Sequence, residues 1–195
     1  MKLSELGISS RNISRAGIIP YIVTSKNVYF ALGVSVFGND MITDFGGGIE
    51  IIDGYREDIV ETAIREYNEE CYDAFDLQLS YDSVIEYNPI VMYSGKGRSV
   101  DLFINLGFAD PDLICSNFLS LVEEQDPKKR EIKEIIWMSD KCISVNKKKA
   151  NSKNSREQFS SSFVEFYYKV GYELIALCST PSFIKELMMS ESFGD

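Results

Sequence analysis

The chain has 195 residues, of which 45% are hydrophobic and 26% are charged, and it carries a formal net charge of −10 without any histidine. This length fits a single domain, because a chain of this size buries roughly 70% of its unfolded surface. Without histidine there is no nucleophile paired with an imidazole base and no histidine-bound zinc. Hydrolytic chemistry would therefore have to use carboxylates, lysines, tyrosines or a metal ion.

The four cysteines lie far apart and form no metal-binding or disulfide framework, so we expect reduced thiols in an intracellular protein. Residues 1–15 are polar and lack the apolar run of a signal peptide. No stretch approaches the roughly 18 consecutive apolar residues of a membrane span. We expect a soluble cytoplasmic protein without a membrane partner.

The first part of the chain predicts strands. Runs rich in Ile, Val, Tyr and Phe at residues 16–24 and 27–36 predict a β-hairpin. A turn at residues 38–40 leads into residues 41–45, and three glycines at residues 46–48 then interrupt the pattern.

The clearest helix is predicted from residue 59 to 71. Asp58, followed three residues later by Glu61, forms a capping-box pattern that satisfies free amide donors at a helix start. At 100° per residue the apolar side chains share one face, which should pack inward. Glu70 falls at the edge of that buried face, next to Ala63.

Later segments predict further strands and helices, without strict βαβ alternation or an internal repeat. This mixture favours an α+β or layered α/β/α architecture in one domain, with a core at about residues 15–140. The predicted elements are, in chain order, strands at 83–93 and 100–108, a helix at 112–124, a strand at 131–138, a loop at 147–153, and C-terminal helices within about 155–190.

Three carboxylates are concentrated at the end of the helix over residues 59–71. Glu66, Glu69 and Glu70 are spaced i, i+3 and i+4, so they repel one another by about 0.2–0.5 kcal/mol per exposed pair. A hard divalent cation such as Mg²⁺ offsets this repulsion and accepts oxygen ligands. The alternative is a solvated acidic face on which Arg65 is a surface ion-pair partner.

These residues resemble the Nudix box. That motif has a glycine, a glutamate, and then Arg-Glu-apolar-x-Glu-Glu-x-Gly-apolar. The chain has Gly47, then Glu57, and after seven residues Arg65-Glu66-Tyr67-x-Glu69-Glu70. Weaker resemblance, in the preceding hairpin and in the strand at 131–138, extends it over residues 15–138.

The motif, from Gly47 to Asp73, departs from the family pattern at several positions. Its loop at residues 51–56 is four residues longer than usual, and Phe45 replaces a frequent proline. Tyr72 stands at the closing glycine, and Asp73 stands at the next apolar position.

The resemblance implies a Nudix-like α/β/α sandwich with a mixed sheet and extra C-terminal helices. It implies that Glu66, Glu69 and Glu70 hold Mg²⁺, or Mn²⁺ in its place, with the carbonyl of Gly46 as a further ligand. Arg65 would orient these carboxylates with Glu57 as its partner. Glu57, Arg65, Glu66 and Glu69 are thus the expected catalytic set.

Two roles are assigned less specifically. The general base is either Glu66 or a later glutamate, with Glu123, Glu124 and Glu131 as candidates. Phosphate contacts are expected from Lys96 and Arg98, or from Arg11 and Arg15 near the start of the chain.

The implied activity is Mg²⁺-dependent hydrolysis of the diphosphate linkage in a nucleoside diphosphate joined to another group. One alternative is decapping of capped RNA, because residues 95–156 hold 12 lysines and arginines against nine acidic residues. Another is an inactive nucleotide-binding module, suggested by Tyr72 and the long loop. The C-terminal helices would pack on the domain, form a homodimer or cover the site.

Overall fold

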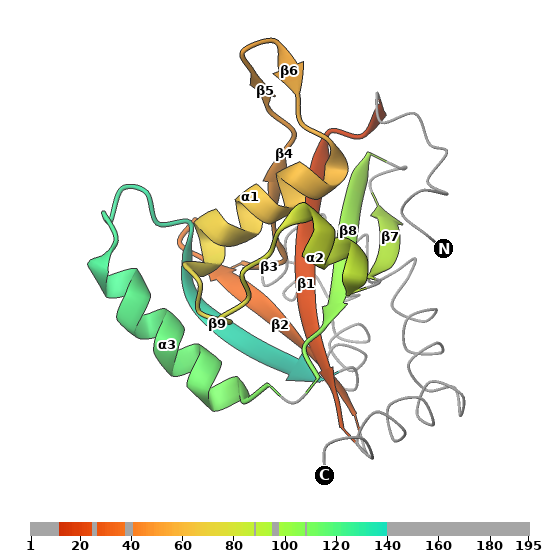
Figure 1. Ribbon diagram of the computed structural model, residues 1–195. Coiled ribbons are helices and arrows are strands. Elements are labelled where there is room, and N and C mark those ends of the chain that lie inside the picture. The colour runs from red at the N-terminus through yellow and green to blue at the C-terminus, as the bar shows by residue number, and fades with distance from the viewer. Residues whose placement is uncertain are drawn as a thin grey trace, which may run out of the picture.

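The computed structural model describes residues 12–24, 27–37, 41–87, 89–94, 98–107 and 109–139. These residues form an α+β structure with a mixed sheet and three helices (Figure 1). The expected C-terminal helices lie outside the described residues. The elements are β1 (Arg15–Val23), β2 (Val28–Ser35), β3 (Ile42–Thr43), β4 (Phe45–Gly48), β5 (Ile51–Ile52), β6 (Tyr55–Arg56), α1 (Ile59–Cys71), α2 (Tyr81–Glu86), β7 (Ile90–Ser94), β8 (Ser99–Asn105), α3 (Pro111–Glu124) and β9 (Ile132–Ser139).

Seven of these strands form one sheet with the order β3-β2-β1-β8-β7, in which β4 pairs with β1 and β9 pairs with β2. The expected hairpin of β1 and β2 is confirmed, with Tyr21 opposite Phe30. β1 and β8 are parallel, with Ile18 opposite Leu102, whereas the other described pairs are antiparallel. The sheet is therefore mixed, as predicted.

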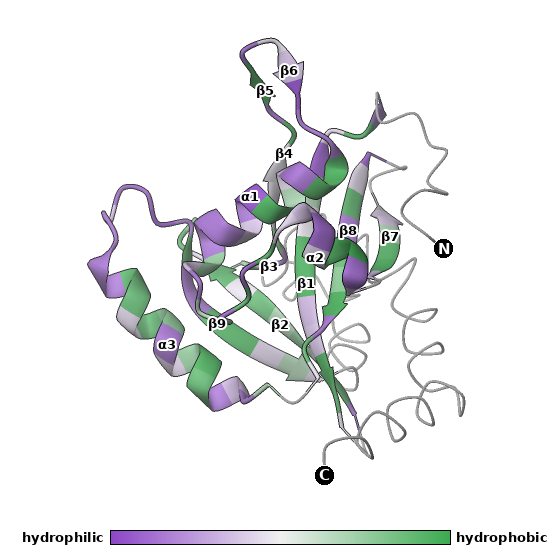
Figure 2. Ribbon diagram, in the orientation of Figure 1, coloured by the Kyte–Doolittle hydropathy of each residue, from purple (hydrophilic) through white to green (hydrophobic). Residues whose placement is uncertain are grey.

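Apolar side chains are buried on both faces of this sheet. The larger cluster joins the sheet to all three described helices, through residues such as Ala63 of α1, Val84 of α2 and Phe118 of α3. The second cluster contains strand residues such as Leu32 and Phe103, and none of the described helices contributes to it. Figure 2 shows mostly hydrophobic strands behind α1, whose visible side is largely hydrophilic. Among the α1 carboxylates, Glu69 is exposed, whereas Glu70 is buried.

The three glycines do not interrupt the strand pattern as predicted, because they belong to β4. β4 pairs with the first half of β1, where Gly46 lies opposite Gly17. A Cβ on either glycine would overlap the backbone of the other strand. Glycine thus permits a close approach of β4 to β1 that a residue with a Cβ would prevent.

The strand predicted over residues 83–93 is wrong in its first half, which forms α2. Ser80 caps this helix by accepting from the amide of Ser83, whose hydroxyl accepts in return from the amide of Ser80. This local capping and the burial of Val84 favour a short helix, and the strand begins only at β7.

The lengthened loop at residues 51–56 is a small hairpin of β5 and β6, which projects from the domain in Figure 1. Asp53 and Gly54 form its turn with positive φ angles of 52° and 82°. An Asp-Gly pair favours such a turn, so the sequence carried this signal. None of the described helices is long and apolar enough to cross a membrane.

Candidate active site

The register of the acidic helix is fixed at its N-terminus. The Asp58 carboxylate accepts from the amides of Val60 and Glu61, at 2.8 and 2.9 Å. The Glu61 carboxylate in turn accepts from the amide of Asp58 at 2.8 Å. The predicted capping box and the predicted bounds of α1 are thus confirmed. Val60 and Tyr67 point into the core, which leaves the carboxylates of the last turns toward β4 and solvent.

Glu70 is buried at the edge of the apolar face, with 6% of its surface exposed. Its Oε2 accepts a hydrogen bond from the amide of Gly46 in β4 at 2.8 Å. Burial, reinforced by the nearby charge of Asp44, raises the pKa of Glu70 to about 9. Because a buried carboxylate without a cation resists ionisation, Glu70 is a group that a bound cation would stabilise.

Glu66 lies against the glycine strand. A Cβ at Gly47 would overlap the carboxylate of Glu66, so the absence of a side chain there provides the space for this group. Glu66 Oε1 forms an ion pair with Arg65 Nη1 at 2.8 Å. Burial raises the pKa of Glu66 although the positive charge of Arg65 opposes this shift.

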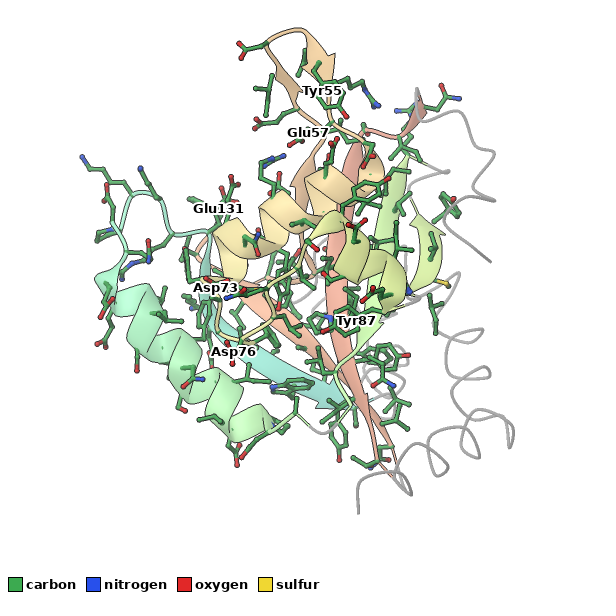
Figure 3. All side chains as sticks on the ribbon, viewed as in Figure 1. Tyr55, Glu57, Asp73, Asp76, Tyr87 and Glu131 are labelled. Atoms are coloured by element: carbon green, nitrogen blue, oxygen red, sulfur yellow. The ribbon has the colours of Figure 1, made fainter. Side chains whose placement is uncertain are left out.

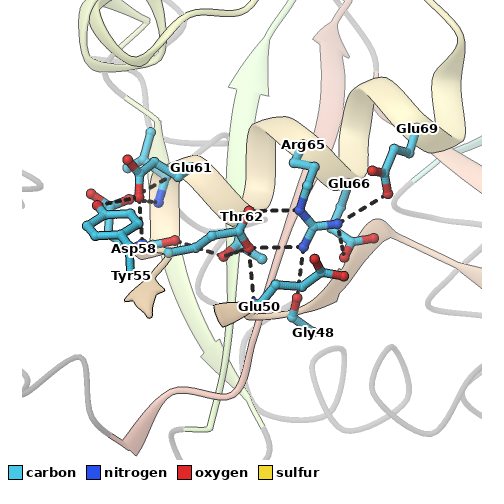
Figure 4. A network of polar contacts seen from close by, with 11 residues as sticks. Gly48, Glu50, Tyr55, Asp58, Glu61, Thr62, Arg65, Glu66 and Glu69 are labelled. Carbon is cyan, nitrogen blue, oxygen red and sulfur yellow. Dashed lines mark hydrogen bonds and ion pairs between the residues drawn. The ribbon is translucent and has the colours of Figure 1, made fainter. Parts of the chain in front are cut away.

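Arg65 is the centre of the polar network drawn in Figure 4. Its Nε and Nη2 donate to the two oxygens of Glu57 at 2.8 and 3.0 Å. Its Nη1 donates to Glu69 at 3.2 Å, and Nη2 also donates to the carbonyl of Gly48 at 3.0 Å. The guanidinium therefore joins α1 to the strand and loop before it.

Glu57 is a buried carboxylate with several donors. Besides Arg65, it accepts from the amide of Glu50 and from the hydroxyl of Thr62, both at 3.1 Å. The hydrogen bond from Arg65 is the main cause that lowers the pKa of Glu57 to about 2. Glu57 is consequently ionised across the physiological range and holds Arg65 in place.

A cavity of about 480 Å³ opens beside the C-terminal half of α1. Glu131, in the segment before β9, also lines this cavity and lies beside α1 in Figure 3. Of the candidates for the general base, Glu66 and Glu131 line this cavity, whereas Glu123 and Glu124 do not. The residues that line it are Glu66, Glu69, Glu70, Tyr72, Gln125, Lys129 and Glu131.

Of the expected phosphate contacts, only Arg98 and Arg15 belong to the described residues, and neither lines this cavity. Lys96 and Arg11 lie outside the described residues. Arg98 is exposed and does not line the cavity. The basic residue that does line it is Lys129, which the sequence placed only in a short basic run after α3. Nothing in the spacing of that run distinguishes Lys129 from its neighbours. Only the tertiary structure shows that Lys129 is the one that lines the cavity.

Arg15 is engaged in a partly buried ion-pair cluster and not in a free phosphate site. Its Nη1 contacts Asp44 Oδ2 at 2.5 Å and Asp101 Oδ1 at 3.4 Å. Burial opposes ionisation of Asp44, but the charge of Arg15 holds its pKa below the ordinary value. Burial and the adjacent Asp44 raise the pKa of Asp101 well above its ordinary value. This cluster was missed, since its residues are scattered over the sequence.

The same arginine contacts the strand that was expected to supply a metal ligand. Arg15 Nη2 donates to the carbonyl of Gly46 at 2.8 Å. Because this carbonyl oxygen already accepts from a cationic side chain, it is a weaker candidate metal ligand than the carboxylates of α1. The amide of Gly46 donates to Glu70.

Within the described residues, no three acidic or cysteine side chains are already arranged around a common metal position. Arg65 accounts for this at α1, because it pairs with both Glu66 and Glu69. The donor chemistry nevertheless fits Mg²⁺, which prefers carboxylate oxygens and retains several waters. Glu70, whose pKa is raised mainly by burial, is a carboxylate that a bound cation would keep ionised.

Tyr72 ends α1 in the left-handed region, with φ 50° and ψ 38°. This conformation explains why a glycine suits the position, since a non-glycine residue there carries a cost of order 1 kcal/mol. The tyrosine ring stacks on Phe118 of α3, with centroids 5.8 Å apart and planes at 27°. Tyr72 therefore connects the end of α1 to α3 at the cavity.

The fold and site define an α+β protein with an acidic helix beside a glycine strand. No protein-family model and no curated protein matches the chain. Among solved structures, it is similar to a binary complex of the C. elegans Ap4A hydrolase, with 16% identity, a TM-score of 0.37, and coverage of 74% of this chain and 93% of that chain. A second structure of the C. elegans Ap4A hydrolase has 15% identity, a TM-score of 0.35, and coverage of 66% of this chain and 82% of that chain. Both similarities are distant.

Proposed function

We propose that this protein is a Mg²⁺-dependent hydrolase of the Nudix type, which cleaves the diphosphate linkage of a nucleoside diphosphate joined to another group. The supporting observation is the cavity in which Glu66, Glu69 and Glu70 from α1 meet Glu131 and Lys129 from the segment before β9. Such a cavity combines oxygen ligands for a cation with a basic group for an anion.

Glu66, Glu69 and Glu70 would hold the metal ion, and Mn²⁺ would replace Mg²⁺. When bound, the ion would offset charge on phosphate oxygens and activate a water for attack on phosphorus. For this arrangement, the carboxylates of Glu66 and Glu69 have to turn from Arg65 toward the cavity. Glu57 would keep Arg65 in place during that change, because its two oxygens bind the guanidinium from the opposite side.

Glu131 is our candidate for the group that takes the proton from the attacking water. It lines the same cavity as the α1 carboxylates and belongs to a different segment, so it does not have to serve as a ligand. Glu66 is the alternative. The Glu131→Gln variant should retain Mn²⁺ affinity and lose most turnover if Glu131 is the base, whereas Glu66→Gln should lose both.

The test of this proposal is a substrate panel with Mg²⁺ and with Mn²⁺. The panel contains nucleotide sugars, dinucleotide polyphosphates, ADP-ribose and capped RNA, each assayed by product chromatography. We expect turnover of at least one substrate, its loss in Glu69→Gln, and its retention in Glu123→Gln, an exposed control outside the cavity. Turnover of no substrate, or equal turnover in Glu69→Gln, would contradict the proposal.

A second candidate function is nucleotide binding without cleavage. The observation that favours it is the engagement of the carboxylates by protein groups, with Arg65 on Glu66 and Glu69 and the Gly46 amide on Glu70. Calorimetry separates the two functions. A non-catalytic module would bind a panel nucleotide without turnover, and Glu69→Gln would leave that affinity unchanged.

A further inference from the structure

The basic run before β9 contains three residues in three different environments. Arg130 folds back on the end of α3, where its Nε and Nη2 donate to the carbonyl of Gln125 at 3.1 and 2.8 Å, and Nη2 donates to the carbonyl of Glu123 at 2.9 Å. Arg130 therefore caps the helix. Lys128 is exposed and does not line the cavity, whereas Lys129 does.

The position of Lys129 is set by a tight turn. Its amide donates to the carbonyl of Asp126 at 2.9 Å, and the amide of Lys128 donates to the Asp126 carboxylate at 3.0 Å. Together with the bonds from Arg130, these contacts order the segment that faces α1. Within the described part of the chain, the Lys129 ammonium makes no ion pair. It is therefore available to an anionic ligand although carboxylates share its cavity.

Tyr72 links this segment to the acidic helix. Its ring stacks on Phe118 of α3, and Tyr72 lines the same cavity as the α1 carboxylates and Lys129. A glycine at this position would relieve the left-handed backbone but would remove the contact with α3. The tyrosine thus connects the end of α1 to α3, the helix that precedes the turn carrying Lys129.

We propose that Lys129 binds a phosphate group of the substrate in this cavity, and that Tyr72 is the positioning residue for it. The proposal rests on the proposed function and assigns two residues to its phosphate site. Because Lys129 and the α1 carboxylates line one cavity, a diphosphate with one phosphate at the cation would place the other phosphate in the same cavity as Lys129.

The test compares Lys129→Gln with Lys128→Gln, which removes the same charge one residue away and outside the cavity. Binding of inorganic pyrophosphate is measured by calorimetry with Mg²⁺ present. We expect Lys129→Gln to weaken binding about tenfold, the value for loss of one charge-assisted contact, and Lys128→Gln to change it less than about twofold. Equal effects of both variants, no effect of either, or no binding by the unmodified protein would overturn the proposal.

The role of Tyr72 is tested with Tyr72→Gly and Tyr72→Phe. Tyr72→Phe keeps the ring, and it removes a buried hydroxyl that has no hydrogen-bond partner in the described residues, so it should bind pyrophosphate like the unmodified protein. Tyr72→Gly should weaken pyrophosphate binding while its Mn²⁺ affinity, measured without pyrophosphate, stays unchanged. Unchanged pyrophosphate binding in Tyr72→Gly, or equal loss of metal affinity, would overturn the positioning role.

These outcomes are independent of turnover. If no panel substrate is cleaved but Lys129→Gln alone loses pyrophosphate binding, the proposed hydrolase fails and this inference stands. If a substrate is cleaved and Lys129→Gln behaves like Lys128→Gln in both KM and pyrophosphate binding, the hydrolase stands and this inference fails.

Discussion

The carboxylate of Glu66 occupies the space that a side chain at Gly47 would need. The glycine strand and the acidic helix are therefore fitted to each other at one point. The overlapping group is the end of a flexible side chain, so a larger residue at Gly47 would displace the carboxylate without disrupting the backbone.

Gly47→Ala should consequently separate stability from metal affinity. We expect the free energy of unfolding to change by less than about 1 kcal/mol, and Mn²⁺ affinity to fall about 10–100-fold, as for other changes that misplace a ligand. Gly48→Ala is the matched control, because a Cβ there has its nearest neighbour 4.0 Å away at the Ser14 carbonyl. Equal metal affinity in the two variants would refute this fit.

Glu57→Gln should lower the free energy of unfolding by about 2–3 kcal/mol at pH 7, because it leaves Arg65 without its charged bidentate partner. The folded pKa of Glu57 is about 2 against an ordinary 4.5, so its contribution is present above pH 4.5 and is lost as the pH falls toward 2. Urea unfolding at several pH values checks this. The difference between variant and unmodified protein should shrink on acidification, and a constant difference would contradict the assignment.

Glu70→Gln should have the opposite effect on stability. The folded pKa of Glu70 is about 9, above the ordinary 4.5. Its contribution to the free energy of unfolding is therefore fully present below pH 4.5 and is lost as the pH rises through 9. In EDTA the variant should exceed the unmodified protein by about 1–3 kcal/mol at pH 7, and this gain should grow with pH. Excess Mg²⁺ should stabilise only the unmodified protein. Glu124→Gln, exposed and outside the cavity, is the control for simple charge removal.

Asp44→Asn and Asp101→Asn should differ although the two carboxyl groups are neighbours. The charge of Arg15 holds the pKa of Asp44 below its ordinary value, so Asp44 is its ionised partner. The Asp44→Asn substitution should therefore lower the free energy of unfolding by about 3 kcal/mol. Burial and Asp44 raise the pKa of Asp101 well above its ordinary value, so we expect this carboxyl to be protonated. Asparagine at position 101 can donate in the same way, so it should cost less than about 1 kcal/mol. Thermal unfolding of both variants at pH 7 measures this. Equal losses would show that the proton is assigned to the wrong residue.

Local patterns in the sequence were sufficient to predict those helices and strands that are stabilised by contacts within the same segment. Asp58 and Glu61 fixed the start of α1, and helical periodicity placed Glu70 at the edge of the buried face, where the structure has it. The same approach failed at α2, because a short apolar run with Ser80 as a cap reads equally well as a strand. Capping decided between the two.

Contacts between distant segments could not be predicted. Lys129 and Glu131 reach the α1 carboxylates only because the chain after α3 turns back into β9 beside β2. Asp101 contacts Arg15, which lies 86 positions earlier in the chain, because β1 and β8 are neighbours in the sheet. No periodicity links such residues, since their proximity follows from strand order.

The sequence by itself determined the acidic helix, its register and its motif resemblance, because capping and helical spacing act over a few residues. Tertiary structure decided which charges share the cavity, that Arg65 holds two of the carboxylates, and that Tyr72 takes the place of a glycine by stacking on Phe118. Those relationships depend on burial and packing between segments far apart in the chain, where desolvation sets which groups remain charged.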